Sequence, residues 1–188
     1  MGDSSNICVS GDSAGGTLVL SNLLAPFDPL ENSALQESLK PGLAVLISPW
    51  THLISDLNRN TPSDYLDYES LRLYGHQYAG STDVNDPIMS PGLRVGSWRD
   101  VSPKHGFHFI FGEEEVFAKA IAHLIFDIEK DDVEVTQDAK KGGIHAWPVV
   151  NLFLGSSRDE RLEGLDKISD IIAMRMGNTI PVKSIKTQ

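Results

Sequence analysis

One serine near the start of the chain stands in a setting that suits a nucleophile. Ser13 lies between Gly11 and Gly15 in the run Gly-Asp-Ser-Ala-Gly, where a short apolar stretch gives way to a helix-like one. A serine hydroxyl is a poor nucleophile unless a base removes its proton and donors stabilise the resulting oxyanion. The glycines permit a tight strand-to-helix elbow that exposes the hydroxyl and directs the backbone amide of Ala14 toward that oxyanion. The pattern predicts a nucleophile, and the alternative is a plain turn followed by a helix cap.

A base for this serine has to come from one of six histidines. His145 follows the last expected strand, in a glycine-containing loop that Trp147 and Pro148 can fix by packing. The others lie in an expected strand, on an expected helix or in loops without a distinctive setting: His52, His76, His105, His108 and His123. We therefore expect His145 to be the base, and the alternative is a loop histidine with no role.

An acid that orients the imidazole is expected just past an earlier strand, because the order nucleophile, acid, histidine is typical of a strand-elbow-helix serine. The run Phe-Gly-Glu-Glu-Glu-Val-Phe at 111–117 stands there. The three glutamates also fit the acidic first turn of a helix, which the helix dipole favours. The residues alone leave the choice of glutamate open.

Apolar runs alternate with helical patterns along the chain, which predicts an α/β protein with a parallel sheet covered by helices. The expected strands are 6–10, 43–48, 107–111 and 133–137, and the expected helices are 14–25, 114–129 and 158–176. The segment 28–40 reads as a polar loop or short helix, and 140–150 as a glycine-rich loop. Residues 51–106 form an irregular, cap-like excursion with one helical piece, and 177–188 form a tail. Together, 1–188 are expected to be a single, partial domain.

The composition limits the classes of molecule that the chain is expected to bind. The formal net charge of −10 disfavours nucleic acid and anionic membrane surfaces, and leaves a neutral or cationic small molecule. The single cysteine, Cys8, cannot form an internal disulfide, and no signal peptide or apolar span of membrane length is visible. These features favour the cytoplasm by default. No cysteine and histidine cluster suggests a metal.

The motifs together resemble the hormone-sensitive-lipase-like carboxylesterase branch of the α/β-hydrolase fold, in particular its fungal esterases and steryl acetyl hydrolase-like members. The matching stretches are Gly-Asp-Ser-Ala-Gly-Gly at 11–16, Leu-Ile-Ser-Pro-Trp at 46–50, the 112–117 run and Gly-Ile-His-Ala-Trp-Pro-Val-Val at 143–150. In that family the acid follows a glycine by three residues, which selects Glu115 and leaves Glu114 in reserve. The resemblance implies a small-molecule ester substrate, an acyl-enzyme on Ser13 with His145 and Glu115, and no cofactor.

The resemblance also implies what the chain lacks. Relatives carry a His-Gly-Gly motif upstream of the serine that supplies other oxyanion donors, and no such motif occurs here. The chain is therefore expected to resemble the C-terminal part of a hydrolase and to have impaired activity. The alternative is an inactive remnant that binds a small ligand or a protein. The first strand is expected to expose an edge that favours self-association.

Overall fold

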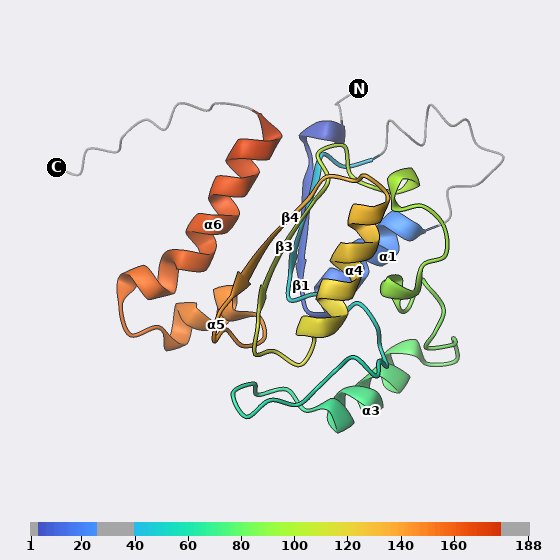
Figure 1. The fold of residues 1–188 in the computed structure, drawn as a ribbon, viewed down its shortest axis with the longest axis horizontal. Coiled ribbons are helices and arrows are strands. Elements are labelled where there is room, and N and C mark those ends of the chain that lie inside the picture. Colours follow the sequence, from blue (N-terminus) through green and yellow to red (C-terminus); the bar gives the residue numbers. More distant parts are fainter. Residues whose placement is uncertain (1–3, 26–39, 178–188) are drawn as a thin grey trace.

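The computed structural model describes residues 4–25 and 40–177, which form a sheet with helices on both faces (Figure 1). Its four strands are β1 (Cys8–Asp12), β2 (Leu43–Ile47), β3 (Phe107–Gly112) and β4 (Val135–Lys140). They are all parallel and lie in the order β1-β2-β3-β4. The expected α/β class with about four parallel strands is confirmed. Apart from residues 40 and 177, the segment 28–40 and the tail lie outside the described residues.

The two central strands are the apolar ones. β2 and β3 are buried almost throughout, because helices cover both of their faces and a strand covers each edge. Alternate residues of β2 enter different cores: Ala44 and Leu46 join one cluster, while Leu43 and Val45 join another. Among the described residues β1 pairs on one side only, so self-association through its outer edge stays a prediction.

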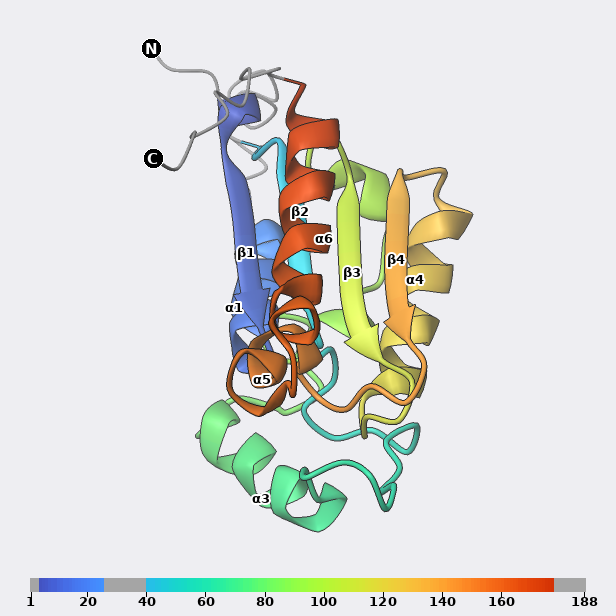
Figure 2. The same cartoon turned by 90° about the vertical axis from the view of Figure 1, so that its left-hand side faces the viewer.

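Helices form a layer on each side of the sheet (Figures 1 and 2). α1 (Ala14–Leu24) and α4 (Ala118–Lys130) cover one face, and the long α6 (Arg158–Met176) covers the other. The short α5 (Trp147–Leu154) precedes α6 and packs against it. Because all four strands are parallel, their carboxyl ends lie at one edge of the sheet.

The irregular segment between β2 and β3 begins at that edge. It contains α3 (Tyr68–Ala79) and two 3-10 turns, Pro91–Leu93 and Trp98–Asp100, and another 3-10 turn, Ser4–Asn6, precedes β1. α3 lies beyond the arrowheads of the strands (Figure 2). From there the chain returns to the start of β3, where the Trp98 ring packs edge-on against Phe107 with centroids 6.0 Å apart.

Four expected elements have wrong boundaries, and the first is β1, which is Cys8–Asp12 instead of 6–10. β4 begins two residues late and extends to Lys140, because it pairs with β3 from Phe107 to Gly112 and an edge strand tolerates polar residues. The loop expected at 140–150 ends early, since α5 begins at Trp147 and Pro148 suits a first helical turn. The helix expected from 114 begins at Ala118.

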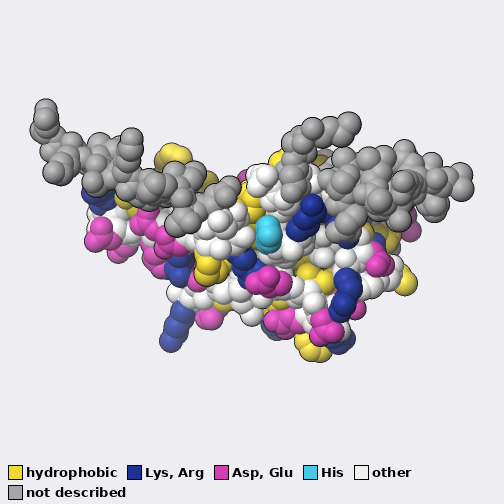
Figure 3. Space-filling model, turned by 90° about the horizontal axis from the view of Figure 1, so that it is seen from above, with side chains coloured by type: hydrophobic (Ala, Val, Ile, Leu, Met, Phe, Trp, Pro, Cys, Tyr) yellow, Lys and Arg dark blue, Asp and Glu magenta, His cyan; other side chains and the backbone are white. Residues whose placement is uncertain are grey.

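Charged side chains of both signs lie on the face opposite the carboxyl edge of the sheet. Seen from the amino ends of the strands, basic and acidic side chains are interspersed over the described surface (Figure 3). In the stretches 4–25 and 40–177 no helix is both long and apolar enough to cross a membrane.

Candidate active site

Ser13 occupies a strained turn between β1 and α1. Its backbone has φ 51° and ψ −119°, a region that non-glycine residues rarely adopt. The Ser13 amide donates to the Ile47 carbonyl at 2.9 Å, and the Ser13 carbonyl accepts from Gly16, Thr17 and Trp50. These contacts fix the turn from both sides, and the serine is half-buried.

Of the two glycines beside the serine, only Gly11 has a steric reason to be glycine. A Cβ on Gly11 would stand 2.3 Å from the Gly15 carbonyl oxygen, so no side chain fits there. A Cβ on Gly15 would meet only Asp12 Oδ1, at 3.8 Å, which is an ordinary contact, so the collision expected at this glycine does not occur. Ala14 is the first residue of α1, and the amides that close the helix onto Ser13 begin with Gly16. Ser13 therefore lies in a strand-to-helix turn, and the role of the Ala14 amide as an oxyanion donor stays a prediction.

Each strand of the sheet is followed by a residue of the candidate site. Ser13 follows β1, Ser48 follows β2, Glu115 lies just past β3 and His145 lies past β4. Parallel strands bring their carboxyl ends to one edge, where ligands of open α/β sheets usually bind. The topology therefore gathers these four side chains although they are far apart in the sequence.

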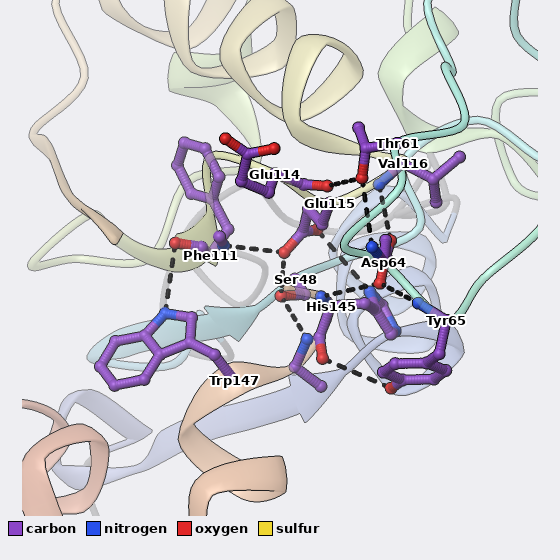
Figure 4. Close-up of polar contacts among 12 residues, drawn as sticks. Ser48, Thr61, Asp64, Tyr65, Phe111, Glu114, Glu115, Val116, His145 and Trp147 are labelled. Atoms are coloured by element: carbon purple, nitrogen blue, oxygen red, sulfur yellow. Dashed lines mark hydrogen bonds and ion pairs between the residues drawn. The ribbon is translucent and has the colours of Figure 1, made fainter. Parts of the chain in front are cut away.

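Glu115 is buried and held by two hydrogen bonds (Figure 4). Its Oε2 accepts from Ser48 Oγ at 2.6 Å and from the Gly112 amide at 2.8 Å. Its Oε1 has no hydrogen-bond partner and lies 3.7 Å from His145 Nδ1, which has none either. One carboxylate oxygen is thus anchored, and the other faces the imidazole.

The neighbouring glutamates are placed differently. Glu113 is exposed and Glu114 is half-buried, whereas the Glu115 side chain has no exposed surface. All three precede α4, so their interpretation as the acidic first turn of a helix is wrong. The turn forms instead because Glu115 reaches back to the Gly112 amide. Of the two glutamates that sequence reasoning retained, the structure brings Glu115 to the histidine.

His145 is buried between aromatic rings. Its imidazole packs edge-on against Phe117, with centroids 5.2 Å apart, and against Tyr65, at 6.0 Å. The next residue, Ala146, has a left-handed backbone with φ 51° and starts the turn into α5. The ring is therefore confined while Nδ1 faces Glu115.

Ser13 and His145 are connected through two aromatic residues. The Trp50 amide donates to the Ser13 carbonyl at 3.0 Å, and the Trp50 ring stacks on Phe117 at 5.9 Å. Phe117 in turn contacts the His145 ring. Within the described ranges no hydrogen bond joins the serine hydroxyl directly to the imidazole.

Sequence reasoning missed two polar residues of the site. The Ser48 hydroxyl donates to Glu115 and accepts from the Ala146 amide at 2.9 Å, so it joins the acid loop to the histidine loop. Its place directly after an apolar strand was a usable signal. Asp64 accepts from the amides of Val116 and His145, and no local pattern marks it.

Tyr65 adds a neutral donor beside the histidine. Burial, and then the negative charges of Asp64, Glu115 and Asp12, raise the pKa of the Tyr65 phenol above its ordinary value of 10.0. The phenol therefore stays protonated at neutral pH, and it donates to the His145 carbonyl at 3.3 Å.

The other histidines have other surroundings. His108 is buried on β3, and His123 is exposed on α4, 3.3 Å from Asp127. His52 is buried beside Thr51, and burial is the main cause that lowers its pKa to about 4. Over residues 4–25 and 40–177, no group of three or more histidine, cysteine or acidic side chains could hold a metal ion.

The sequence of the chain is similar to known proteins. A family model described as alpha/beta hydrolase fold matches residues 1–149. The Schizosaccharomyces pombe protein mug81, provisionally named a steryl acetyl hydrolase, is 32% identical over 127 residues, which cover 62% of this chain and 32% of that protein.

Solved structures show the same fold. An esterase from the bacterial hormone-sensitive lipase family superimposes with a TM-score of 0.73 and 21% identity, covering 93% of this chain and 55% of the other. An esterase/lipase from an uncultured bacterium gives a TM-score of 0.71 and 22% identity, with the same coverage of both chains. The chain thus spans 32% of the length of the curated relative and 55% of these two structures.

Proposed function

We propose, because the chain belongs to the alpha/beta hydrolase fold family, that it is a serine hydrolase that cleaves carboxylic esters through an acyl-enzyme on Ser13. The observation that carries this proposal is the buried pair of His145 and Glu115 at the sheet edge that also bears the strained Ser13. A short approach of Nδ1 to the free oxygen of this carboxylate, from the present 3.7 Å, would form the hydrogen bond that leaves Nε2 able to accept a proton.

The proposed reaction has two halves. His145 takes the proton of Ser13 as the oxygen attacks the ester carbonyl, and then gives that proton to the departing alcohol. A water molecule next attacks the acyl-serine as His145 accepts one of its protons, and His145 then gives this proton to Ser13 Oγ as the acyl–oxygen bond breaks and the acid product leaves. Glu115 stabilises the imidazolium in both halves, and Asp12 takes no catalytic part.

Oxyanion stabilisation is the weak point of the proposed site. The Ala14 amide is one donor, and the His-Gly-Gly motif that supplies others in the family does not occur in these 188 residues. Loss of one oxyanion donor typically costs about 100- to 1000-fold in rate. We therefore propose that the 188-residue chain by itself acts slowly.

The proposed substrate is a small, uncharged ester. The name of the Schizosaccharomyces pombe relative makes the acetate ester of a bulky apolar alcohol the first class to test. The test is hydrolysis of p-nitrophenyl acetate by the wild-type chain and by Ser13→Ala. A Ser13→Ala rate equal to that of the wild type would refute a nucleophilic Ser13.

The second candidate function is an inactive hydrolase remnant that binds a small apolar ligand or a protein. The absence of a direct hydrogen bond between Ser13 and His145, within the part of the chain that the structure describes, favours it. Labelling by a fluorophosphonate separates the two functions. Rapid labelling at Ser13 excludes the remnant, whereas a folded chain that resists labelling excludes the esterase.

A further inference from the structure

The Asp64 carboxylate bridges the two loops that bear the proposed acid and base. Its Oδ2 accepts from the Val116 amide at 2.8 Å, and its Oδ1 accepts from the His145 amide at 3.2 Å (Figure 4). Val116 is the residue next to Glu115, so each of these hydrogen bonds acts on a loop within one residue of the proposed chemistry. A charged acceptor makes such hydrogen bonds about twice as strong as neutral ones.

Two neighbours of Asp64 hold the same loops. Thr61 donates through Oγ1 to the Glu114 carbonyl, and the Tyr65 hydroxyl donates to the His145 carbonyl. Side chains of segment 61–65 therefore bind one amide and one carbonyl of each loop. Two such contacts limit rotation as well as translation of the loop backbone. The segment itself is closed by the Asp64 amide, which donates to Thr61 Oγ1 at 3.2 Å.

The sheet does not supply this restraint by itself. The loops are also joined by Ser48 and by the Glu114 amide, which donates to the Gly143 carbonyl. Those contacts lie on the sheet side of the site, whereas segment 61–65 comes from the irregular excursion between β2 and β3. The loops are thus held from two sides, and loss of one side loosens them without unfolding the sheet.

We propose that segment 61–65 is a positioning element for the proposed acid and base, with Asp64 as its principal positioning residue. The proposal rests on the function proposed above, since positioning has meaning only if His145 and Glu115 act on Ser13. In this proposal Asp64 fixes the distance between the Glu115 and His145 side chains, which is 3.7 Å from Oε1 to Nδ1.

The test is Asp64→Asn in the 188-residue chain, with two readouts. The first is hydrogen exchange of the Val116 and His145 amides by NMR, which is expected to become about tenfold faster on loss of a hydrogen bond to a charged acceptor. The second is fluorophosphonate labelling of Ser13. Its maximal rate is expected to fall about 10- to 100-fold while the half-saturating probe concentration stays unchanged, as for misplacement of catalytic groups.

Asp67→Asn is the matched control. Asp67 lies three residues further along the same excursion and also accepts two hydrogen bonds, from the Ser70 amide at 2.8 Å and from Asn60 Nδ2 at 3.1 Å. It contacts neither loop of the site, so both readouts are expected to stay within about twofold of wild type. Equal slowing by Asp64→Asn and Asp67→Asn would overturn the proposal, and so would wild-type labelling by Asp64→Asn.

A second variant guards against misfolding of Asp64→Asn. Tyr65→Phe removes only the hydroxyl that donates to the His145 carbonyl and keeps the ring against the imidazole. A smaller drop of the same kind, in maximal labelling rate alone, supports the positioning element, and no drop overturns it. If the wild type is not labelled at Ser13, the proposed function fails, and unaltered exchange at Val116 and His145 in Asp64→Asn still overturns the Asp64 bridge.

Discussion

The described part of the chain holds two buried histidines beside carboxylates at nearly the same distance, yet the two regions differ in almost every other respect. His145 Nδ1 lies 3.7 Å from Glu115 at the carboxyl edge of the sheet, and His108 Nε2 lies 3.5 Å from Asp138 between β3 and β4. The shorter distance belongs to the pair that is remote from Ser13. Distance alone therefore does not identify a catalytic pair.

The surroundings of the carboxylate separate the two regions. Glu115 is completely buried and one of its oxygens is free to face the imidazole, whereas Asp138 is one-third exposed and accepts from Lys167 at 2.7 Å. His108 Nδ1 is taken up by Thr136 at 2.9 Å. Burial is the main cause that lowers the pKa of His108, so its imidazole is neutral at pH 7 and its contact with Asp138 is not an ion pair. We infer that the first pair serves the reaction and the second serves packing.

Replacing the histidines gives the largest expected contrast. His145→Ala removes the proposed base and is expected to lower p-nitrophenyl acetate hydrolysis by about 10,000-fold or more. His108→Ala is expected to keep the activity of the folded fraction within about threefold while lowering stability, because it leaves a cavity beside Thr136. Hydrolysis rates and thermal melts of both variants check this. Comparable activity losses in the two variants would contradict the inference that only the first pair serves the reaction.

Replacing the carboxylates should give a smaller contrast. Glu115→Gln keeps the shape of the side chain but removes the charge that stabilises the imidazolium, so the rate is expected to fall about 100- to 10,000-fold. Asp138→Asn is expected to leave the rate within about twofold, since its main partner is Lys167 on α6. Steady-state kinetics of the two variants measure this contrast. A rate for Glu115→Gln near that of wild type would point to another acid.

A fall in pH should lower the free energy of unfolding through His108, the histidine of the second pair. The pKa of His108 is lowered on folding from its ordinary 6.5, so below about pH 6.5 the unfolded chain binds a proton that the folded chain resists, and the free energy of unfolding falls. His52, with a pKa of about 4, adds to the same slope. Urea unfolding at several pH values should show a smaller slope between pH 7 and 5 for His108→Gln than for wild type. An identical slope would contradict a buried neutral His108.

The smallest effect is expected at an exposed pair. His123 Nδ1 lies 3.3 Å from Asp127 on α4, and about half of the His123 side chain is exposed. His123→Ala is expected to change the free energy of unfolding by less than about 1 kcal/mol and to leave the hydrolysis rate unchanged. A rate loss in this variant would show that contacts remote from the carboxyl edge also affect the site.

The sequence alone predicts a structural feature when the residues that determine it are neighbours in the chain. Gly11 and Ser13 mark the elbow because its steric demands fall within five residues, and the apolar run of β2 marks a strand buried on both faces. The choice between Glu114 and Glu115 needed the resemblance to a family, since both residues fit the local pattern. The end of β4 depends on its pairing with β3, which sequence periodicity does not contain.

The rest of the site depends on contacts between distant residues. Ser48 lies 67 residues from Glu115 along the chain, and Asp64 lies 81 residues from His145. Ser48 stands in the 46–50 stretch, but its partners Glu115 and the Ala146 amide are distant in the sequence, and Asp64 stands in no motif. The roles of both residues follow only from contacts that folding creates.

The strand order carries a consequence for synthesis of the protein. Each strand pairs with the one made before it, so the sheet can grow in the direction of translation, from β1 to β4. Ser13 would leave the ribosome before β2 is made, and the imidazole of His145 would follow only after β4. During synthesis the nascent chain thus passes through a stage in which the proposed nucleophile has been made and the proposed base has not.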